Sequence, residues 1–376
     1  MTNHSRSKAA PTCCRPAFPP PGSCRCRSIA TSPFAEVDAL VRAGLGVQYS
    51  AAVVRIDAGG KPRFVRAYGS LRSEPDAPPV FADTRFDVAS LTKIFVSTVA
   101  LGLVGAGRLD LDAPLTGPIT EWRETPHAPI TLRMLLAHVA GLRSGADYRT
   151  LFDCNVEMFA LREPLVGVPG AGVVYSDLGF IALGVVLARC SGTSLAHLVE
   201  STLQAYGARR TSYAVPSAER RRVAATERER WRGLVQGAVH DEKAFLMNGV
   251  AGHAGLFADV ADVARAGEWY LAALRGRPSP LPPALARAAV SEAAFDPVLR
   301  RGLGWALRTT DENSCGVRIS RSAFGHTGFT GTSLWLDPER DAGVVLLTNA
   351  VHYGRADLRA RRAAVCDAAI AELDRA

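Results

Sequence analysis

A serine and a lysine stand three residues apart at the start of a long apolar run, in Ser90-Leu-Thr-Lys93. On a helix, residues i and i+3 share a face, so the hydroxyl and the amine would be neighbours. A serine in the first turn lies near the positive end of the helix dipole, and its backbone N–H is free to bind an oxyanion. Burial would lower the pKa of the lysine, because desolvation disfavours the ammonium, and would let it act as a base. The pair therefore predicts an activated serine nucleophile.

Lysine is rare in this chain, which sharpens that interpretation. Lysine occurs only at Lys8, Lys61, Lys93 and Lys243, and arginine supplies the other positive side chains. The alternative is a serine near a helix start followed by a solvated lysine, where arginine would serve as well. An arginine keeps its proton in proteins, whereas an amine can lose it. A lysine retained beside Ser90 therefore favours the catalytic interpretation.

Two further polar segments are uninformative when taken singly. Tyr175-Ser-Asp177 follows Pro169-Gly170 and precedes an apolar helical pattern, where a packed aromatic residue is common. His326-Thr-Gly328 lies in a glycine-rich segment beside an apolar strand pattern, and is typical of a turn that approaches another backbone closely. Their order along the chain after Ser90 is what carries information.

The elements that must position these residues follow from the spacing of apolar residues and from turn residues. We expect a helix over 34–43, a β-hairpin with strands at 47–56 and 63–68, and mostly helical structure from 90 to about 245. Expected later elements are a helix over 259–274, a linker over 278–283, strands at 302–308, 317–320, 333–336 and 344–348, and a helix over 358–373. This order predicts an α+β fold in which both ends of the chain build an antiparallel sheet flanked by helices. The predicted units are a tail (1–33), a discontinuous sheet domain (34–88 and 249–376) and a mostly helical inserted domain (89–248).

The composition is that of an ordinary globular protein. The 376 residues are 48% hydrophobic and 21% charged, with a net charge of +8. Residues 1–33 carry five basic residues and no acid, so the rest of the chain has a net charge of only +3. That excess is too small for a nucleic-acid groove, and no apolar stretch has the length of a membrane span. We expect no nucleic acid and no integral membrane segment, while the oligomeric state stays open.

The first 33 residues are rich in Pro, Ser, Arg and Cys and lack the apolar core of a signal peptide. We expect a disordered tail and a cytoplasmic protein. The four cysteines of the tail, which lack the spacing of a standard zinc site, are Cys13, Cys14, Cys24 and Cys26. The other four, expected as small buried hydrophobic residues without disulfides, are Cys154, Cys190, Cys315 and Cys366.

Ser-x-x-Lys, then Tyr-x-Asp about 85 residues later, then His-Thr-Gly before a C-terminal hairpin resemble the serine β-lactamase-like superfamily. The tyrosine of the second motif makes the chain similar to the class C branch, which includes DD-peptidases and esterases. The resemblance extends from about Val47 to Asn349 and takes in Leu135–Leu142, Val250–Leu256 and Gly302–Trp305. It implies a β-lactamase/transpeptidase-like fold and a serine hydrolase that cleaves an ester or amide bond through an acyl-enzyme, without metal or cofactor. The substrate that it implies is a small molecule or a short peptide.

The resemblance also implies roles for individual residues. Ser90 Oγ would attack the carbonyl, and Lys93 and Tyr175 would share its proton, one as base and the other as relay to the leaving group. The backbone N–H groups of Ser90 and Phe329 would form the oxyanion hole. Water would then cleave the acyl-enzyme.

The remaining implied site residues surround the substrate. Thr327 would hydrogen-bond a substrate carboxylate or carbonyl, and His326 and Gly328 belong to the same motif. Asp177 would orient the side-chain network, and we expect His253, among glycines, to line the pocket near the third motif.

Two of these residues depart from the pattern of the family's β-lactamases. Asp177 stands where they have asparagine, and a carboxylate only accepts hydrogen bonds and repels anionic substrates. His326 stands where they have lysine, and histidine is only partly charged at neutral pH. Both departures disfavour efficient β-lactamase activity and favour hydrolysis of an ester or a D-amino-acid peptide.

Other histidines are expected to be structural. His240-Asp241-Glu242 and His253 lack a recognised metal-ligand spacing, so we expect no metal there. His138, in an apolar helical pattern, is expected to be a core histidine bonded to backbone.

Three alternatives stay open at this point. The chain could be a β-lactamase or a cell-wall DD-peptidase of the penicillin-binding type, and the latter activity requires export. It could also be a non-hydrolysing sensor that binds β-lactams or peptides. A sensor would form an acyl-enzyme that never hydrolyses.

Overall fold

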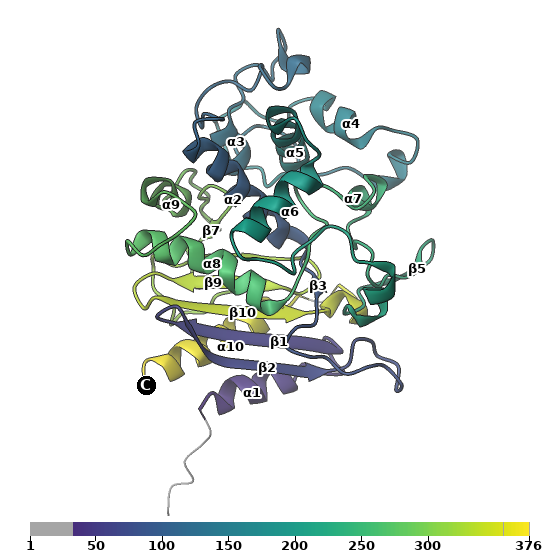
Figure 1. Cartoon of the computed structure of the whole chain (residues 1–376), viewed down its shortest axis with the longest axis vertical. Helices are drawn as coiled ribbons and strands as arrows, with labels where there is room; N and C mark the ends of the chain where they lie inside the picture. Colours follow the sequence, from purple (N-terminus) through teal and green to yellow (C-terminus); the bar gives the residue numbers. More distant parts are fainter. Residues whose placement is uncertain (1–32, 356, 376) are drawn as a thin grey trace, which may run out of the picture. The chain divides into compact units, whose positions relative to one another are not determined.

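A six-stranded antiparallel sheet, in the order β2-β1-β10-β9-β8-β7, forms the centre of the computed structural model, which describes residues 33–355 and 357–375 (Figure 1). The strands are β1 (Ala51–Ala58), β2 (Lys61–Gly69), β7 (Ala306–Leu307), β8 (Phe324–Thr327), β9 (Ser333–Asp337) and β10 (Ala342–Thr348). Strand β1 pairs with β10, so that Val54 lies opposite Leu346. The predicted antiparallel sheet built from both ends of the chain is therefore confirmed.

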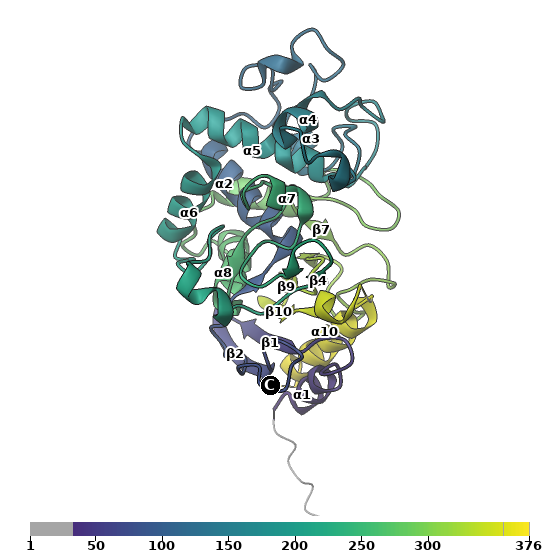
Figure 2. The ribbon, with the colours of Figure 1, turned by 90° about the vertical axis from the view of Figure 1, so that its right-hand side faces the viewer.

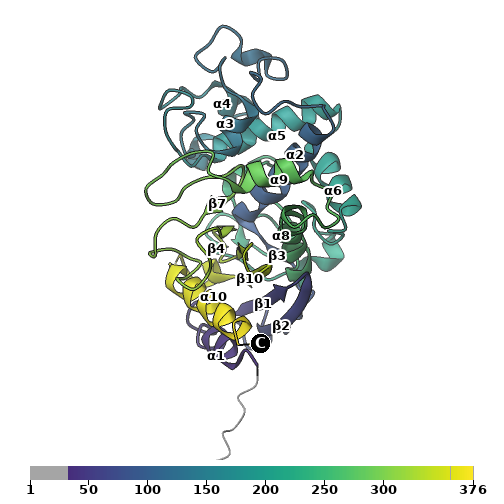
Figure 3. The same cartoon turned by 90° about the vertical axis from the view of Figure 1, so that its left-hand side faces the viewer.

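Alternate residues of the strands pack into two hydrophobic clusters, one on each face of the sheet. On β1, Ala51 and Val53 join the larger cluster, together with residues of the central helices. Ala52 and Val54 join the second cluster, with residues of the two terminal helices. Figure 3 shows α8 and α10 on opposite sides of the sheet. The helices concerned are α1 (Ala35–Arg42), α8 (Val260–Leu274) and α10 (Arg359–Leu373).

The helical part of the chain surrounds one buried helix, α2 (Thr92–Gly105), which follows the 3₁₀ turn Ala89–Leu91. Nearly all residues of α2 are buried, and it contacts α5 and α6 (Figure 2). The other helices are α3 (Leu132–Leu136), α4 (Val156–Arg162), α5 (Asp177–Ser191), α6 (Leu195–Ala205), α7 (Glu242–Leu246) and α9 (Pro283–Val290). Short strands are β3 (Phe86–Asp87), β4 (Arg228–Glu229), β5 (Gly233–Leu234) and β6 (Phe257–Ala258). No single helix of the described residues has the length and apolarity to cross a membrane. Only α5 and α6 taken together do by length and composition, and these two helices are bent by 80°.

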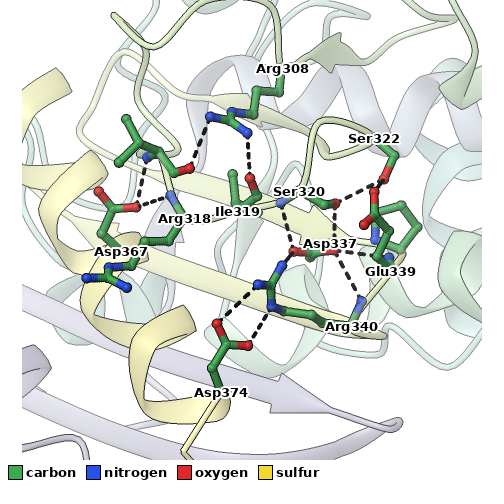
Figure 4. A network of polar contacts seen from close by, with 12 residues as sticks. Arg308, Arg318, Ile319, Ser320, Ser322, Asp337, Glu339, Arg340, Asp367 and Asp374 are labelled. Atoms are coloured by element: carbon green, nitrogen blue, oxygen red, sulfur yellow. Dashed lines mark hydrogen bonds and ion pairs between the residues drawn. The ribbon is translucent and has the colours of Figure 1, made fainter.

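The predicted strand at 317–320 is wrong, because side chains occupy the backbone groups that a strand would pair (Figure 4). The Asp367 carboxylate accepts hydrogen bonds from the N–H groups of Val317 and Arg318 at 2.8 and 2.7 Å. The Arg308 guanidinium donates to the carbonyl oxygens of Val317 and Ile319 at 3.1 and 2.6 Å. The segment is thus held as an irregular connection between β7 and β8.

Other predicted boundaries also move. The strand predicted over 302–308 is reduced to β7, and the linker over 278–283 leads into a helix, α9, that was not predicted. His326 and Thr327 end strand β8 and do not form a turn. The helices predicted over 34–43, 259–274 and 358–373 and the first hairpin are confirmed within a few residues.

Residues 34–376 form one compact unit, and their division into a sheet domain and a helical domain remains an interpretation. The predicted disordered tail and its four cysteines lie outside the described residues. Cys315 and Cys366 are buried, as predicted, whereas Cys154 is exposed and Cys190 is half-buried. These four described cysteines are free thiols.

Candidate functional site

Ser90 lies in a strained turn that a buried carboxylate holds in place. Ala89, the residue before it, has φ of 47°, a left-handed conformation that is costly for a residue with a side chain. The buried Asp87 carboxylate accepts a hydrogen bond from Ala89 N–H at 2.8 Å and another from His240 N–H at 2.6 Å. Asp87 therefore fixes the backbone from which Ser90 projects.

The loop after β8 clamps the same turn from the side of the sheet. The Thr330 hydroxyl donates to Asp87 O at 2.7 Å, and the Thr332 hydroxyl donates to Val88 O at 3.1 Å. A Cβ added to Gly328 would lie 2.4 Å from Val88 O, so only glycine permits this approach. The nucleophile turn and the His-Thr-Gly segment are thus held together, although Asp87 and Thr330 are 243 residues apart in the chain.

Lys93 lies one helical turn after Ser90 and is completely buried. Its Nζ donates to Ser90 Oγ at 3.1 Å, to Asp177 Oδ1 at 2.9 Å and to His253 O at 3.1 Å. All three ammonium protons therefore have acceptors. The amine and the hydroxyl meet, as the spacing predicted.

The predicted lowering of the Lys93 pKa is wrong. Burial does act in that direction, but the Asp177 carboxylate and the Tyr175 hydroxyl raise the pKa of Lys93 above its usual value. Lys93 in turn holds the pKa of Asp177 below its ordinary value, against the effect of burial. The resting site therefore holds an ammonium paired with a carboxylate.

A second lysine extends this pair into a closed ring of charged and polar groups. Lys243 Nζ lies 3.4 Å from Asp177 Oδ2 and 3.1 Å from Asp241 Oδ2. Asp241 Oδ1 lies 2.9 Å from His253 Nε2, and the His253 carbonyl returns to Lys93. Burial lowers the pKa of Lys243, but the two carboxylates outweigh it and raise that pKa overall. Two of the four lysines of the chain thus neutralise the Asp177 carboxylate.

Tyr175, two residues before the start of α5, lies beside two cations. Lys93 Nζ is 5.0 Å and the Arg301 guanidinium carbon 5.1 Å from the centroid of its ring. His138 packs on the ring with a centroid separation of 4.4 Å, and His138 Nδ1 accepts a hydrogen bond from Ser176 N–H. Burial lowers the pKa of His138 well below its usual value, so it stays neutral and can accept this bond. His138 is the core histidine bonded to backbone that the sequence predicted.

His326 is buried and uncharged. Burial, together with the charges of Lys93 and Arg301, lowers the pKa of His326 to about 3. Its Nδ1 donates to Thr327 O at 2.9 Å, since a carbonyl oxygen only accepts. Its Nε2 has no hydrogen-bond partner among the described residues. His326 therefore supplies no positive charge for an anionic substrate at neutral pH.

A cleft of about 460 Å³ opens at Ser90. Its wall includes Ser90, Tyr175, Arg301, His326, Thr327, Gly328, Phe329, Trp335, Arg355, Asp357 and Arg362. Phe329 is 56% exposed, in the turn directly after the end of β8. The cleft thus gathers residues from all three motifs, although Lys93 and Asp177 are not among those that line it.

His253 does not line this cleft, contrary to expectation. Its side chain is only 1% exposed and lies behind Lys93, where it bonds to Asp241 and presents its carbonyl to the ammonium. Sequence reasoning also missed the roles of Asp87, of Lys243 and of Asp241, which pairs with Lys243. The rarity of lysine was the one sequence signal that pointed to Lys243.

Two described groups have donor atoms close enough to share a metal ion, Asp177 with Asp241 and His253, and Glu227 with Glu229 and His240. In the first group, both carboxylates already accept from lysine ammonium groups. In the second group, Glu229 pairs with Arg232 at 2.6 Å. Cations of the chain itself therefore occupy these carboxylates.

Comparison with known proteins agrees with this geometry. A family model described as β-lactamase matches residues 37–368. N-acetylmuramyl-L-alanine amidase of Bacillus subtilis (strain 168) is 30% identical, over 86% of this chain and 82% of that protein. A putative D-alanyl-D-alanine carboxypeptidase of Escherichia coli (strain K12) is 30% identical, over 73% of this chain and 71% of that protein.

Solved structures share the fold. EstCE1, a hydrolase with promiscuous acyltransferase activity, superposes with a TM-score of 0.75 at 21% identity, over 91% of this chain and all of that one. A class C β-lactamase superposes with a TM-score of 0.73 at 18% identity, over 89% of this chain and 96% of that one. The predicted β-lactamase/transpeptidase-like fold is confirmed.

Proposed function

This chain belongs to the β-lactamase family and is a serine hydrolase, and we propose that Ser90 is its nucleophile, cleaving an ester or amide bond through an acyl-enzyme. The observation that carries the assignment is the contact of Lys93 Nζ with Ser90 Oγ, 3.1 Å apart, at the cleft. A buried ammonium within hydrogen-bond reach of a serine hydroxyl, and itself held by a third group, favours loss of the hydroxyl proton and so activates the serine as a nucleophile. Here the third group is Asp177.

Lys93 acts as an ammonium in this mechanism and not as the base. It already holds its proton and donates to three acceptors, so it cannot accept another from Ser90. The Tyr175 hydroxyl instead relays the proton: as the Oγ–carbon bond forms, the Tyr175 oxygen accepts the Ser90 proton while its own proton passes to the departing oxygen or nitrogen. Water, activated along the same route, then cleaves the acyl-enzyme. The charge of Lys93 stabilises the oxygen of Ser90 as it loses its proton.

The backbone N–H groups of Ser90 and Phe329 would bind the developing oxyanion. The hydroxyl clamps of Thr330 and Thr332 support this role, because they hold the turn that carries Phe329 against the nucleophile turn. Donors fixed before the reaction need no reorganisation when charge develops.

The substrate class we propose is a short peptide or ester that contains a D-amino acid. The name of the carboxypeptidase relative supports the D-amino acid, the name of the amidase relative supports cleavage of an amide bond, and EstCE1 supports ester cleavage on the same fold. β-Lactamase activity is the less favoured alternative, since His326 is neutral where the family's β-lactamases carry lysine.

The test is intact-protein mass spectrometry after brief incubation with a short-chain aryl ester, a β-lactam or a D-Ala-D-Ala peptide. We expect an acyl adduct or turnover with wild type and neither with Ser90→Ala. Ser201→Ala, on the exposed face of α6, is the matched control and should behave as wild type.

Three outcomes would decide against parts of this proposal. Undiminished turnover by Ser90→Ala would refute the nucleophile. A Ser90 adduct that forms and persists for hours would favour the non-hydrolysing sensor. Rapid turnover of the β-lactam alone would favour the β-lactamase alternative.

A further inference from the structure

The two N–H groups proposed as the oxyanion hole belong to turns from distant parts of the chain. Neither the Ser90 N–H nor the Phe329 N–H donates to an acceptor within the described residues, so both are free to bind an oxyanion. They can bind the same oxygen only if the two turns keep a fixed separation. Such donors act by being fixed before charge develops, so whatever sets this separation contributes to the reaction.

The Phe329 side chain, 56% exposed at the cleft, packs on two polar side chains. The His240 ring lies nearly parallel to the Phe329 ring, with a centroid separation of 5.6 Å and an interplanar angle of 29°. The Arg355 guanidinium carbon lies 5.3 Å from the centroid of the same ring. Ring stacking and cation–π contacts both stabilise an aromatic side chain in one orientation. These two contacts therefore hold a ring that solvent would leave mobile.

One carboxylate joins these two partners of Phe329. Glu227 Oε2 accepts hydrogen bonds from His240 Nε2 at 2.9 Å and from Arg355 Nη2 at 3.2 Å. The hydrogen bond from His240 lowers the pKa of Glu227 below its ordinary value, so the carboxylate is ionised and only accepts. His240, Glu227 and Arg355 thus form a connected platform under the Phe329 ring.

The backbone of His240 connects this platform to the nucleophile turn. The His240 N–H donates to Asp87 Oδ2 at 2.6 Å, and Asp87 Oδ1 accepts from Ala89 N–H at 2.8 Å. The His240 carbonyl oxygen accepts from Arg232 Nη2 at 2.6 Å. Hydrogen bonds to charged groups are costly to break when they are buried, and His240 is only 3% exposed. The His240 ring is therefore fixed relative to the turn that carries Ser90.

The peptide between Gly328 and Phe329 is held from its other side as well. Arg362 Nη2 donates to Gly328 O at 2.9 Å. The C=O and N–H of a trans peptide point in opposite directions, so this bond aims the Phe329 N–H away from Arg362. Arg362 thus fixes the plane of the peptide, while the platform fixes the side chain of Phe329.

We infer that His240 is a positioning residue for the oxyanion hole, an inference that rests on the proposed function. It holds Phe329 through its ring and the Ser90 turn through its backbone N–H, so the two donors keep one separation. A merely structural histidine would change stability and affect all substrates alike. His240 should instead affect the reaction according to the atom that takes the negative charge.

The test compares a short-chain aryl ester with its thionoester, in which sulfur replaces the carbonyl oxygen. Sulfur is a weak hydrogen-bond acceptor, so the ester-to-thionoester ratio of kcat/KM reports on the oxyanion donors. Removing one donor costs about 100- to 1000-fold in kcat, and displacing it should cost less. We expect His240→Ala to lower the ratio by about 10- to 100-fold, with the loss for the ester in kcat more than in KM.

His127→Ala is the matched control. His127 is also a buried histidine that stacks on an aromatic ring, that of Trp122 at 5.7 Å and 22°, but it does not line the cleft. Its ratio should equal that of the wild type. His240→Phe keeps a ring against Phe329 and should retain more of the ratio than His240→Ala. A ratio that falls no more in His240→Ala than in His127→Ala overturns the inference.

A double-mutant cycle checks that His240 acts through Phe329. Phe329→Ala keeps the backbone N–H but removes the exposed ring, and it should lower the ratio by itself. His240→Ala added to Phe329→Ala should lower the ratio no further. Independent, multiplying effects would overturn the inference. If His240→Ala does not fold, Phe329→Ala decides alone, because an unchanged ratio in that variant also overturns it.

Hydrogen exchange without substrate separates this inference from the proposed function. Exchange of the peptide that covers residues 324–332 should become faster in His240→Ala and stay unchanged in His127→Ala. If that holds while the wild type hydrolyses neither ester, His240 does position the turn and the proposed function fails. Equal exchange of this peptide in both variants overturns the positioning role, whatever the activity.

Discussion

Replacing Lys243 by methionine tests whether the charged ring behind Ser90 is a working part of the site. At an effective dielectric constant of about 20, unit charges roughly 3 Å apart attract by about 5 kcal/mol. Lys243 has two such partners, at 3.4 Å and 3.1 Å, and its side chain is only 11% exposed. Desolvation offsets much of this attraction, and removing one member of a buried ion pair usually costs about 3–5 kcal/mol. We expect Lys243→Met to lower the free energy of unfolding by about 3 kcal/mol.

Urea unfolding measures this cost, which should appear as a fall of about 1 M in the midpoint. We also expect kcat on a neutral aryl ester to fall roughly tenfold. Lys93 and Lys243 both pair with the Asp177 carboxylate, and without Lys243 this carboxylate is less firmly positioned beside Lys93. Lys61→Met is the matched control, since Lys61 is exposed at the start of β2. If Lys243→Met and Lys61→Met unfold within about 0.5 kcal/mol of each other, the ring does not stabilise the site and the reasoning is wrong.

Two further predictions concern the third motif. Gly328→Ala places a Cβ against Val88 O and should lower kcat by at least roughly tenfold. Gly117→Ala is the control and should leave steady-state kinetics unchanged, because its Cβ meets open space. Equal kcat values for the two variants would show that the close approach of Gly328 to Val88 is irrelevant. The folded-state pKa of His326, lowered to about 3, means that the unfolded chain binds a proton in a range where the folded chain does not. Stability from this group is therefore present above the unfolded pKa, near 6.5, and is lost as the pH falls toward 3. Thermal unfolding at pH 7 and pH 4 should show that stability falls less on acidification in His326→Gln than in the wild type. The control His197→Gln, at an exposed site, should match the wild type. Equal falls in stability in all three proteins would contradict the assigned pKa of His326.

Much of the fold could be predicted from local pattern. Helices and strands with regular apolar spacing, such as α8 and the hairpin of β1 and β2, appear within a few residues of their expected positions. The predicted strand at 317–320 failed because Asp367 and Arg308, distant in sequence, take up its backbone groups. Side chains that compete for backbone hydrogen bonds leave no periodic signal.

The ionisation of the site is where local reasoning failed most clearly. An apolar environment around Lys93 was predictable, and burial alone would lower its pKa. The opposite result depends on Asp177, 84 residues away, lying 2.9 Å from the amine. A charge at that distance outweighs burial, and only the folded chain shows the distance.

The sequence by itself determined which residues were candidates for the chemistry, because Ser90, Lys93 and Tyr175 follow one another in a recognisable order. It also determined the α+β class, since apolar periodicity is a local property. Only the tertiary structure decided that Lys243 closes the ring around Asp177 and that the His240 ring packs on the turn after β8. Both results depend on contacts between segments far apart in the chain. Electrostatic energy varies with distance in space, and spacing along a sequence does not encode it.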